Sequence, residues 1–113
     1  MSCLFCKIAE GDIPADKVFE DDEVVAFRDI NPAAPTHILV IPKKHISTMN
    51  DVVAEDQAVL GKMMLVAKDI AAQEGVDEDG FRFALNTNSH GGQSVYHIHL
   101  HLLAGRQMQW PPG

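Results

Sequence analysis

The feature that most constrains the fold is the stretch YHIHLHLL at residues 96–103. Its three histidines, His97, His99 and His101, occupy alternate positions, and apolar residues stand between them. Side chains of a β-strand point alternately to opposite faces. The stretch therefore predicts a strand with one apolar face, which packs on a long helix, and one face that carries three imidazoles.

Strand spacing limits what these imidazoles can do together. A strand rises roughly 3.3 Å per residue, so neighbouring histidines start about 6.6 Å apart and the outer two about 13 Å apart. Nitrogens bound to one zinc ion lie about 3.4 Å from each other. A straight strand can bring two of the three histidines to one metal ion, but not all three. We therefore expect separate roles for them; a polar, solvated strand face is the alternative interpretation.

Imidazoles in this arrangement suit chemistry at phosphorus. A neutral histidine is a nucleophile near pH 7, and a protonated neighbour can hydrogen-bond developing negative charge. Attack by an imidazole nitrogen forms a phosphohistidine, which water then hydrolyses. The preceding loop, residues 88–94, is consistent with this chemistry. Gly91 and Gly92 let the backbone approach a ligand closely, and Gln93 and Ser94 supply an amide and a hydroxyl.

Composition and charge exclude several classes of protein. The 113 residues suit one domain, residues 1–113, with a small core that a partner subunit could extend. The formal net charge of -7 argues against a nucleic-acid polymer as partner. No run of about 18 apolar residues could cross a membrane. The first residues, MSCLFCKIAEGDIP, lack the basic and apolar regions of a signal peptide, so we expect a cytoplasmic protein.

The remaining pattern predicts an α+β fold with an antiparallel meander sheet. Apolar residues recur at helical spacing over one long helix, Glu55–Glu74, which Gly75 ends. The other expected elements, in chain order, are a short helix over residues 5–10 ended by Gly11, hairpin strands at 18–20 and 24–27, a rigid loop at 31–35, and strands at 37–42, 81–87 and 96–103.

The pattern His-φ-His-φ-His-φ-φ at residues 97–103, where φ is apolar, resembles the signature of the histidine triad (HIT) family. The segments DIPADKVFEDDEVVAFRDINPAAPTHILVIPKKHI and GGQSVYHIHLHLLAGRQMQWPPG are similar to its nucleotide-binding Hint branch. The resemblance covers nearly the whole chain. It implies a HIT-like α+β fold and a homodimer. It also implies hydrolysis of purine nucleoside 5′-phosphoramidates, and of aminoacyl-adenylates as further candidates, through a covalent nucleotidyl-histidine.

The same resemblance implies catalytic roles for four residues. His99 would be the nucleophile, and His101 would contact phosphate oxygens and help to place the leaving group or water. His37 would hydrogen-bond His99 and hold its tautomer, the orienting role that a catalytic base commonly needs. Ser94 would lie near the leaving amine.

A nucleotide pocket is implied in the same way. Asp29 would accept hydrogen bonds from the ribose, and Asn86 and Ser94 would bind the phosphate region. Gln93 would line the same loop, and Trp110 would reach the site of the partner subunit. From the residues alone, Asp29 is a solvated loop carboxylate and Trp110 an exposed aromatic. The positions implied to sandwich the base, otherwise ordinary core residues, are Leu4, Phe5, Ile8, Phe27 and Ile30.

Cys3 and Cys6 form a C-x-x-C pair. A lasting disulfide is disfavoured in a reducing compartment, and no βαβ pattern supports a thioredoxin-like pair. The resemblance implies a structural zinc, not required for catalysis, that His45 and His97 complete. Two reduced cysteines beside a surface histidine are the alternative.

Three other functions stay open. The pattern of the related nucleotidyltransferase branch resembles His-φ-His-φ-Gln, with glutamine at the position of His101. The histidine at this position favours a hydrolase. A dinucleoside polyphosphate hydrolase, a purine nucleotide-binding regulatory module with incidental turnover, and a metal-binding structural protein are the alternatives. Gln109, where some relatives have histidine, leaves the preferred leaving group open. Ala104, where glycine is frequent, requires a negative φ.

Overall fold

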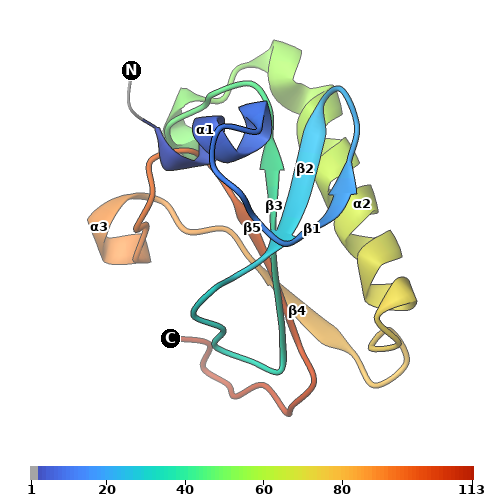
Figure 1. Cartoon of the computed structure of the whole chain (residues 1–113). Coiled ribbons are helices and arrows are strands. Elements are labelled where there is room, and N and C mark those ends of the chain that lie inside the picture. Colours follow the sequence, from blue (N-terminus) through green and yellow to red (C-terminus); the bar gives the residue numbers. More distant parts are fainter. Residues whose placement is uncertain (1–2) are drawn as a thin grey trace.

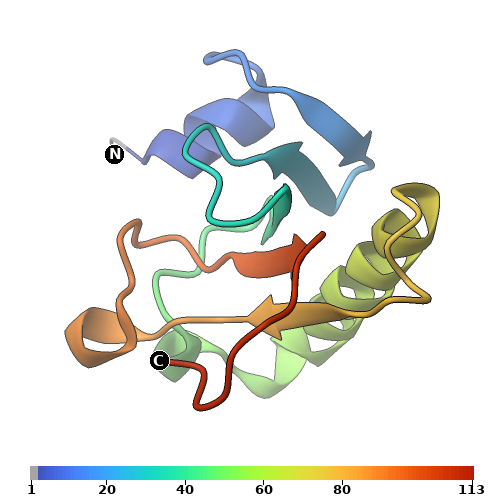
Figure 2. The same cartoon turned by 90° about the horizontal axis from the view of Figure 1, so that it is seen from below.

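The computed structural model describes residues 3–113 as one five-stranded antiparallel sheet with a helix against each face (Figures 1 and 2). The strand order is β1-β2-β3-β5-β4. The elements are α1 (Leu4–Glu10), β1 (Lys17–Glu20), β2 (Val24–Arg28), β3 (Thr36–Pro42), two short 3-10 turns (Met49–Asp51 and Ala54–Asp56), α2 (Gln57–Gln73), β4 (Phe81–Ala84), α3 (Asn88–Gly91) and β5 (Leu100–Ala104).

Strand alternation divides the core into two layers, as the apolar pattern predicts. One layer lies between the sheet and α2; its buried members include Val24, Ala26, Ile38, Val40, Ile98, Leu100, Leu102, Met63 and Ile70. The other lies between the sheet and α1; its buried members include Val25, Phe27, Leu39, Ile41, Phe5 and Ile8. The predicted packing of Ile98, Leu100 and Leu102 on the long helix is therefore confirmed. The histidines of the triad face the α1 side, where His97 and His99 meet Phe5.

The last strand is shorter than predicted. β5 begins at Leu100, so His97 and His99 precede it and only His101 lies within it. The ladder with β3 runs from Thr36 paired with Ala104 to Val40 paired with Leu100. Its continuation would reach Pro42, which has no N–H to donate and whose carbonyl accepts a hydrogen bond from the His97 ring. The ladder ends there, although Ile98 still points into the α2 layer.

Other boundaries differ by a few residues. β4 ends at Ala84, paired with His101, because its partner strand extends only one residue further. The predicted loop at 88–94 contains the four-residue helix α3, which Gly92 ends with φ 80°. α1 ends at Gly11, with φ 84°, as expected. Ala104 has no positive φ, as its side chain requires. Within residues 3–113, no helix is long and apolar enough to span a bilayer.

Candidate active site

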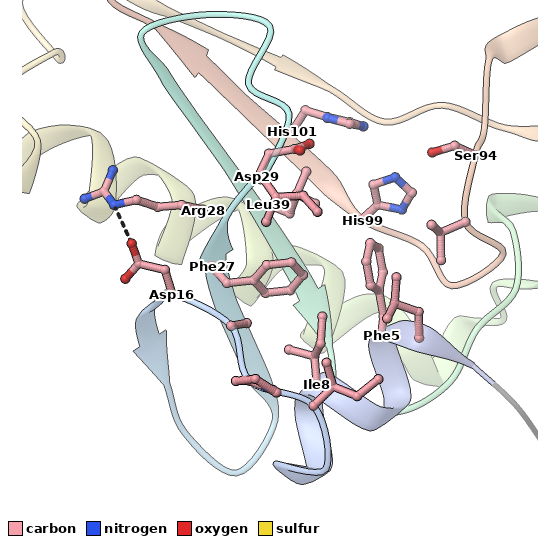
Figure 3. A pocket seen from close by; sticks show the side chains of 16 residues that line it. Phe5, Ile8, Asp16, Phe27, Arg28, Asp29, Leu39, Ser94, His99 and His101 are labelled. Carbon is pink, nitrogen blue, oxygen red and sulfur yellow. Dashed lines mark ion pairs between the residues drawn. The ribbon is translucent and has the colours of Figure 1, made fainter.

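A cleft of about 280 Å³ opens between α1 and the sheet (Figure 3). α1 and the loop after it form one wall, the end of β2 forms another, and His99 and His101 close the inner side. Most of the predicted nucleotide-binding residues line it, namely Leu4, Phe5, Ile8, Phe27, Asp29, Ile30, Ser94, His99 and His101. The structure therefore brings the apolar positions and two histidines of the triad into one site.

Three residues that were predicted to bind the nucleotide do not line this cleft in the single chain. Asn86 lines a separate groove with Arg82 and Met108. The indole of Trp110 is 81% exposed. The Gln93 side chain is occupied by backbone groups, since it donates to the Ser47 carbonyl at 2.7 Å and accepts from the Asn88 N–H at 2.9 Å. Gln93 therefore shapes the loop that presents Ser94.

His99 offers a nitrogen lone pair to the cleft. Its Nδ1 lies 2.8 Å from the carbonyl oxygen of His97. A carbonyl only accepts, so Nδ1 carries the hydrogen and Nε2 keeps the lone pair. Burial lowers the pKa of His99, which keeps the ring neutral at pH 7. The Phe5 ring packs edge-on against it, with centroids 5.1 Å apart and planes at 87°.

A hydrogen-bond relay determines the proton position on His101. The Ala33 N–H donates to Nδ1 of His37 at 3.0 Å, so the His37 proton is on Nε2. That Nε2 lies 2.9 Å from Nδ1 of His101 and donates to it. His101 therefore carries its own proton on Nε2. The prediction that His37 bonds His99 is wrong, because Nδ1 of His37 bonds the Ala33 amide and its Nε2 bonds His101.

The Nε2–H of His101 is buried and has no hydrogen-bond partner among residues 3–113. Burial, aided by His99 and His37, lowers the pKa of His101 to about 4, so it is neutral at pH 7 rather than the protonated neighbour that we expected. The His99 and His101 ring centroids are 4.9 Å apart. The cleft thus places a nucleophilic lone pair beside an unpaired N–H donor.

Sequence reasoning missed several members of the site. The Ala33 amide carries no side-chain signal, although its rigid PAAP loop was visible. Leu39 lines the cleft and pairs with His101 across the ladder, as its position two residues after His37, on the same face of β3, could have suggested. Asp16 and Arg28 flank the cleft with a 3.7 Å ion pair (Figure 3).

The four predicted zinc ligands converge. The donor atoms of Cys3, Cys6, His45 and His97 all lie within 4.8 Å of one another. His97 Nδ1 is 3.4 Å from Cys3 Sγ, 3.5 Å from Cys6 Sγ and 3.2 Å from His45 Nδ1. Donor atoms around a tetrahedral zinc ion lie roughly 3.4–3.8 Å apart. The cluster therefore has nearly the dimensions of a Cys₂His₂ site.

The chemistry of the donors also fits a metal ion. His97 donates from Nε2 to the Pro42 carbonyl at 2.7 Å, so its Nδ1 lone pair faces the thiols. Burial lowers the pKa of His97, which favours the neutral, ligating ring. Burial and the neighbouring Cys3 raise the pKa of the Cys6 thiol to about 11, so metal binding would release a proton from it.

A second group, Asp29, His37 and His101, has similar spacing but different chemistry. The Ala33 N–H occupies the only lone pair of His37, and Nε2 therefore carries hydrogen. That nitrogen cannot ligate a metal ion while the hydrogen bond lasts. We interpret this group as the relay described above, with Asp29 Oδ2 at 3.5 Å from His37 Nε2.

Comparison with known proteins identifies close relatives. A model of the HIT domain matches residues 10–108. The purine nucleoside phosphoramidase of Escherichia coli (strain K12) is 59% identical over 105 residues, covering 93% of this chain and 88% of the relative. A HIT family hydrolase from Legionella pneumophila superposes with a TM-score of 0.98 and 62% identity, covering 99% of this chain and 100% of that one.

A zinc-bound histidine triad family protein from Mycobacterium smegmatis is a more distant structural relative. It is 35% identical, with a TM-score of 0.80, over 94% of this chain and 76% of that one.

The hydrogen bonds predict the tautomers at pH 7.5. We expect Nε2–H on His37 and His101, and Nδ1–H on His99, in long-range ¹H–¹⁵N spectra. Because its pKa is about 4, the His101 signals should stay constant between pH 8 and pH 5. An Nδ1–H on His101, or protonation of that ring near pH 6.5, would contradict the relay.

Proposed function

The chain belongs to the HIT family, and we propose that it hydrolyses purine nucleoside 5′-phosphoramidates to nucleoside monophosphate and an amine. The observation that carries the proposal is the pairing of the His99 lone pair with the unpaired His101 N–H in one cleft. A module that only binds nucleotides does not need a poised nucleophile. The name of the Escherichia coli relative supports this substrate class.

In the proposed reaction, His99 Nε2 attacks the α-phosphorus and the P–N bond breaks. The amine leaves with a proton from solvent, and a nucleotidyl-histidine remains. Water then attacks the phosphorus and loses its protons to solvent, the P–N bond to His99 breaks, and the nucleoside monophosphate leaves as His99 regains its lone pair. Nδ1 of the neutral His101 accepts the hydrogen bond from His37 and carries no hydrogen. The Nε2–H of His101 therefore donates a hydrogen bond to a phosphoryl oxygen, where negative charge develops.

The other residues of the cleft position the substrate. The apolar side chains of Leu4, Phe5 and Phe27 offer flat and edge contacts to a purine. Asp29 lines the same cleft, and its carboxylate is suited to accept hydrogen bonds from the ribose hydroxyls. Ser94 lines the end nearest His99 and suits the leaving amine. His37 is a positioning residue that acts through His101.

Replacement of His99 by alanine should abolish hydrolysis of adenosine 5′-phosphoramidate. Loss of a catalytic nucleophile lowers kcat by roughly 10⁴–10⁶-fold. Liberated AMP is followed by chromatography for the parent and for His99→Ala. The matched control, His90→Ala in exposed α3, should retain the parental rate.

Two outcomes would count against this reaction. AMP release by His99→Ala at the parental rate would exclude the assigned nucleophile. AMP binding without turnover by the parent would favour a purine nucleotide-binding regulatory module.

We also propose that Cys3, Cys6, His45 and His97 hold a structural zinc ion. The near-tetrahedral spacing and the inward lone pair of His97 support it. When bound, the ion supplies a covalent cross-link between segments far apart in the sequence. Because the closed set of four ligands leaves no open position, zinc would not take part in the reaction.

Purified protein should contain about one zinc ion per chain by elemental analysis, a stoichiometry set by the four-ligand site. Cys6→Ser should lose most of the metal, and its thermal midpoint should fall toward that of chelator-treated parent. His99→Ala, which leaves all four ligands intact, should keep its zinc. Equal metal content in Cys6→Ser and parent would overturn the assignment.

We propose that the chain acts as one domain and as a homodimer. α2 exposes Met64 (48%) and Leu65 (61%), and β4 is an edge strand of the sheet. An apolar patch beside an open edge commonly marks a protein contact. We also propose that Trp110, which is 81% exposed in the single chain, reaches the site of the partner subunit.

Sedimentation should give a dimer for the parent, whose chain mass is 12.4 kDa. Leu65→Glu should shift the mass toward the monomer, because it puts a charge on the proposed interface. Glu55→Gln, in the exposed 3-10 turn before α2, should leave the mass unchanged. A monomeric parent at micromolar concentration would contradict the proposal.

A further inference from the structure

The short helix α1 belongs to both clusters of this molecule. Cys3 is its N-cap residue, and Cys6 lies in its first turn. Leu4, Phe5 and Ile8 of the same seven-residue helix form a wall of the cleft. The proposed zinc ligands and the proposed purine wall are therefore interleaved within residues 3–8.

The cysteine–histidine cluster connects α1 to two other segments. Cys6 Sγ lies 3.3 Å from Nδ1 of His45, which follows β3. Cys3 Sγ lies 3.4 Å from Nδ1 of His97, which precedes β5. A metal ion at this point would bind α1 to both segments at once.

Without that link, α1 depends on weaker contacts. An isolated helix shorter than about 12 residues is marginal in water. α1 is then held mainly by Phe5, Ile8 and Ala9, which bury against the α1-side layer. The Phe5 ring, placed edge-on to both His97 and His99, depends directly on where α1 sits.

The hydrogen bonds that orient His99 and His101 come from groups outside α1. The His97 ring is anchored to the Pro42 carbonyl, and the His97 carbonyl receives the His99 N–H. The relay to His101 passes through Ala33 and His37. A displaced α1 would therefore alter the purine wall more than the nucleophile.

We propose that the Cys3–Cys6 pair is a thiol-oxidation switch, and that its oxidation releases the metal ion and weakens binding of the purine nucleotide. The inference rests on the proposed function and on the proposed zinc. A peroxide serves as the oxidant. The two zinc-bound thiolates lose two electrons and form one S–S bond, hydrogen peroxide gains them and becomes two hydroxide ions, and Zn²⁺ departs. The disulfide lies within α1 and its cap, so it replaces a cross-link between three segments with a local one.

The test treats zinc-loaded parent with hydrogen peroxide. Released zinc is followed with a chromogenic chelator, and AMP affinity is measured by calorimetry before treatment, after it, and after dithiothreitol plus zinc. We expect zinc release and a rise of about tenfold or more in the Kd for AMP, the scale found when groups that support a site are lost. KM for adenosine 5′-phosphoramidate should rise with it, and kcat should change much less.

Two controls separate the switch from other damage. Methionine sulfoxide also forms under peroxide but is not reversed by dithiothreitol, so recovery of AMP affinity identifies the thiols. Cys3→Ser/Cys6→Ser should bind AMP weakly from the start and should not respond to peroxide. Circular dichroism at the assay temperature reports whether the sheet persists in each sample.

The outcomes are distinguishable. Unchanged AMP affinity after full zinc release would overturn the switch, as would an equal loss in the serine variant. Loss of the sheet signal on oxidation would also overturn it, because the ion would then be needed for the whole fold. If untreated protein failed to hydrolyse the phosphoramidate, the proposed function would fail by itself, and the AMP titrations would still decide the switch.

Discussion

The hydrogen bond from the Ala33 N–H to Nδ1 of His37 determines the proton arrangement on the catalytic side of the cleft. A neutral imidazole has one donor and one acceptor, so fixing one nitrogen fixes the other. The bond makes His37 a donor to His101 and makes His101 a donor to the cleft. It also denies a metal ion access to His37. Because of this one backbone amide, the histidines of the relay serve as hydrogen-bond donors, whereas His45 and His97 are the histidines with the geometry to bind a metal ion.

Alternation along the chain places the histidines of both groups in the triad stretch on one side of the sheet. β5 and the residues before it place apolar side chains toward α2 and imidazoles toward α1. Pro42 ends the ladder, and its free carbonyl then orients the His97 ring toward the thiols. The backbone carbonyl of His97 orients the His99 ring. His97 is therefore the point where the metal cluster and the reactive cleft meet, with its ring serving one and its backbone the other.

Much of this was predictable because it depends on period and residue type. The two faces of the triad stretch, the long helix, the hairpin and the helix ended by Gly11 all follow from apolar spacing and turn residues. Convergence of Cys3, Cys6, His45 and His97 was implied by the family resemblance, and it agrees with the rule that three strand histidines cannot share one ion. The partner of His37 was predicted wrongly, because tautomers depend on backbone groups such as the His97 carbonyl and the Ala33 amide. Those groups carry no signal in a sequence, and the early end of β5 depended on a cross-strand neighbour, Pro42.

The low pKa values of the buried imidazoles have a consequence for the end of the catalytic cycle. His99 and His101 are both neutral at pH 7, and the carboxylate of Asp29 is a charge that acts on both rings. Charge-assisted bonds to phosphate are roughly twice as strong as neutral ones. Beside these two histidines, a nucleotide product that becomes more negative on hydrolysis meets neutral donors and apolar contacts, because the cation that flanks the cleft, Arg28, is already paired with Glu74 and Asp16. We expect such a product to leave without breaking an ion pair, so that the site favours release over retention.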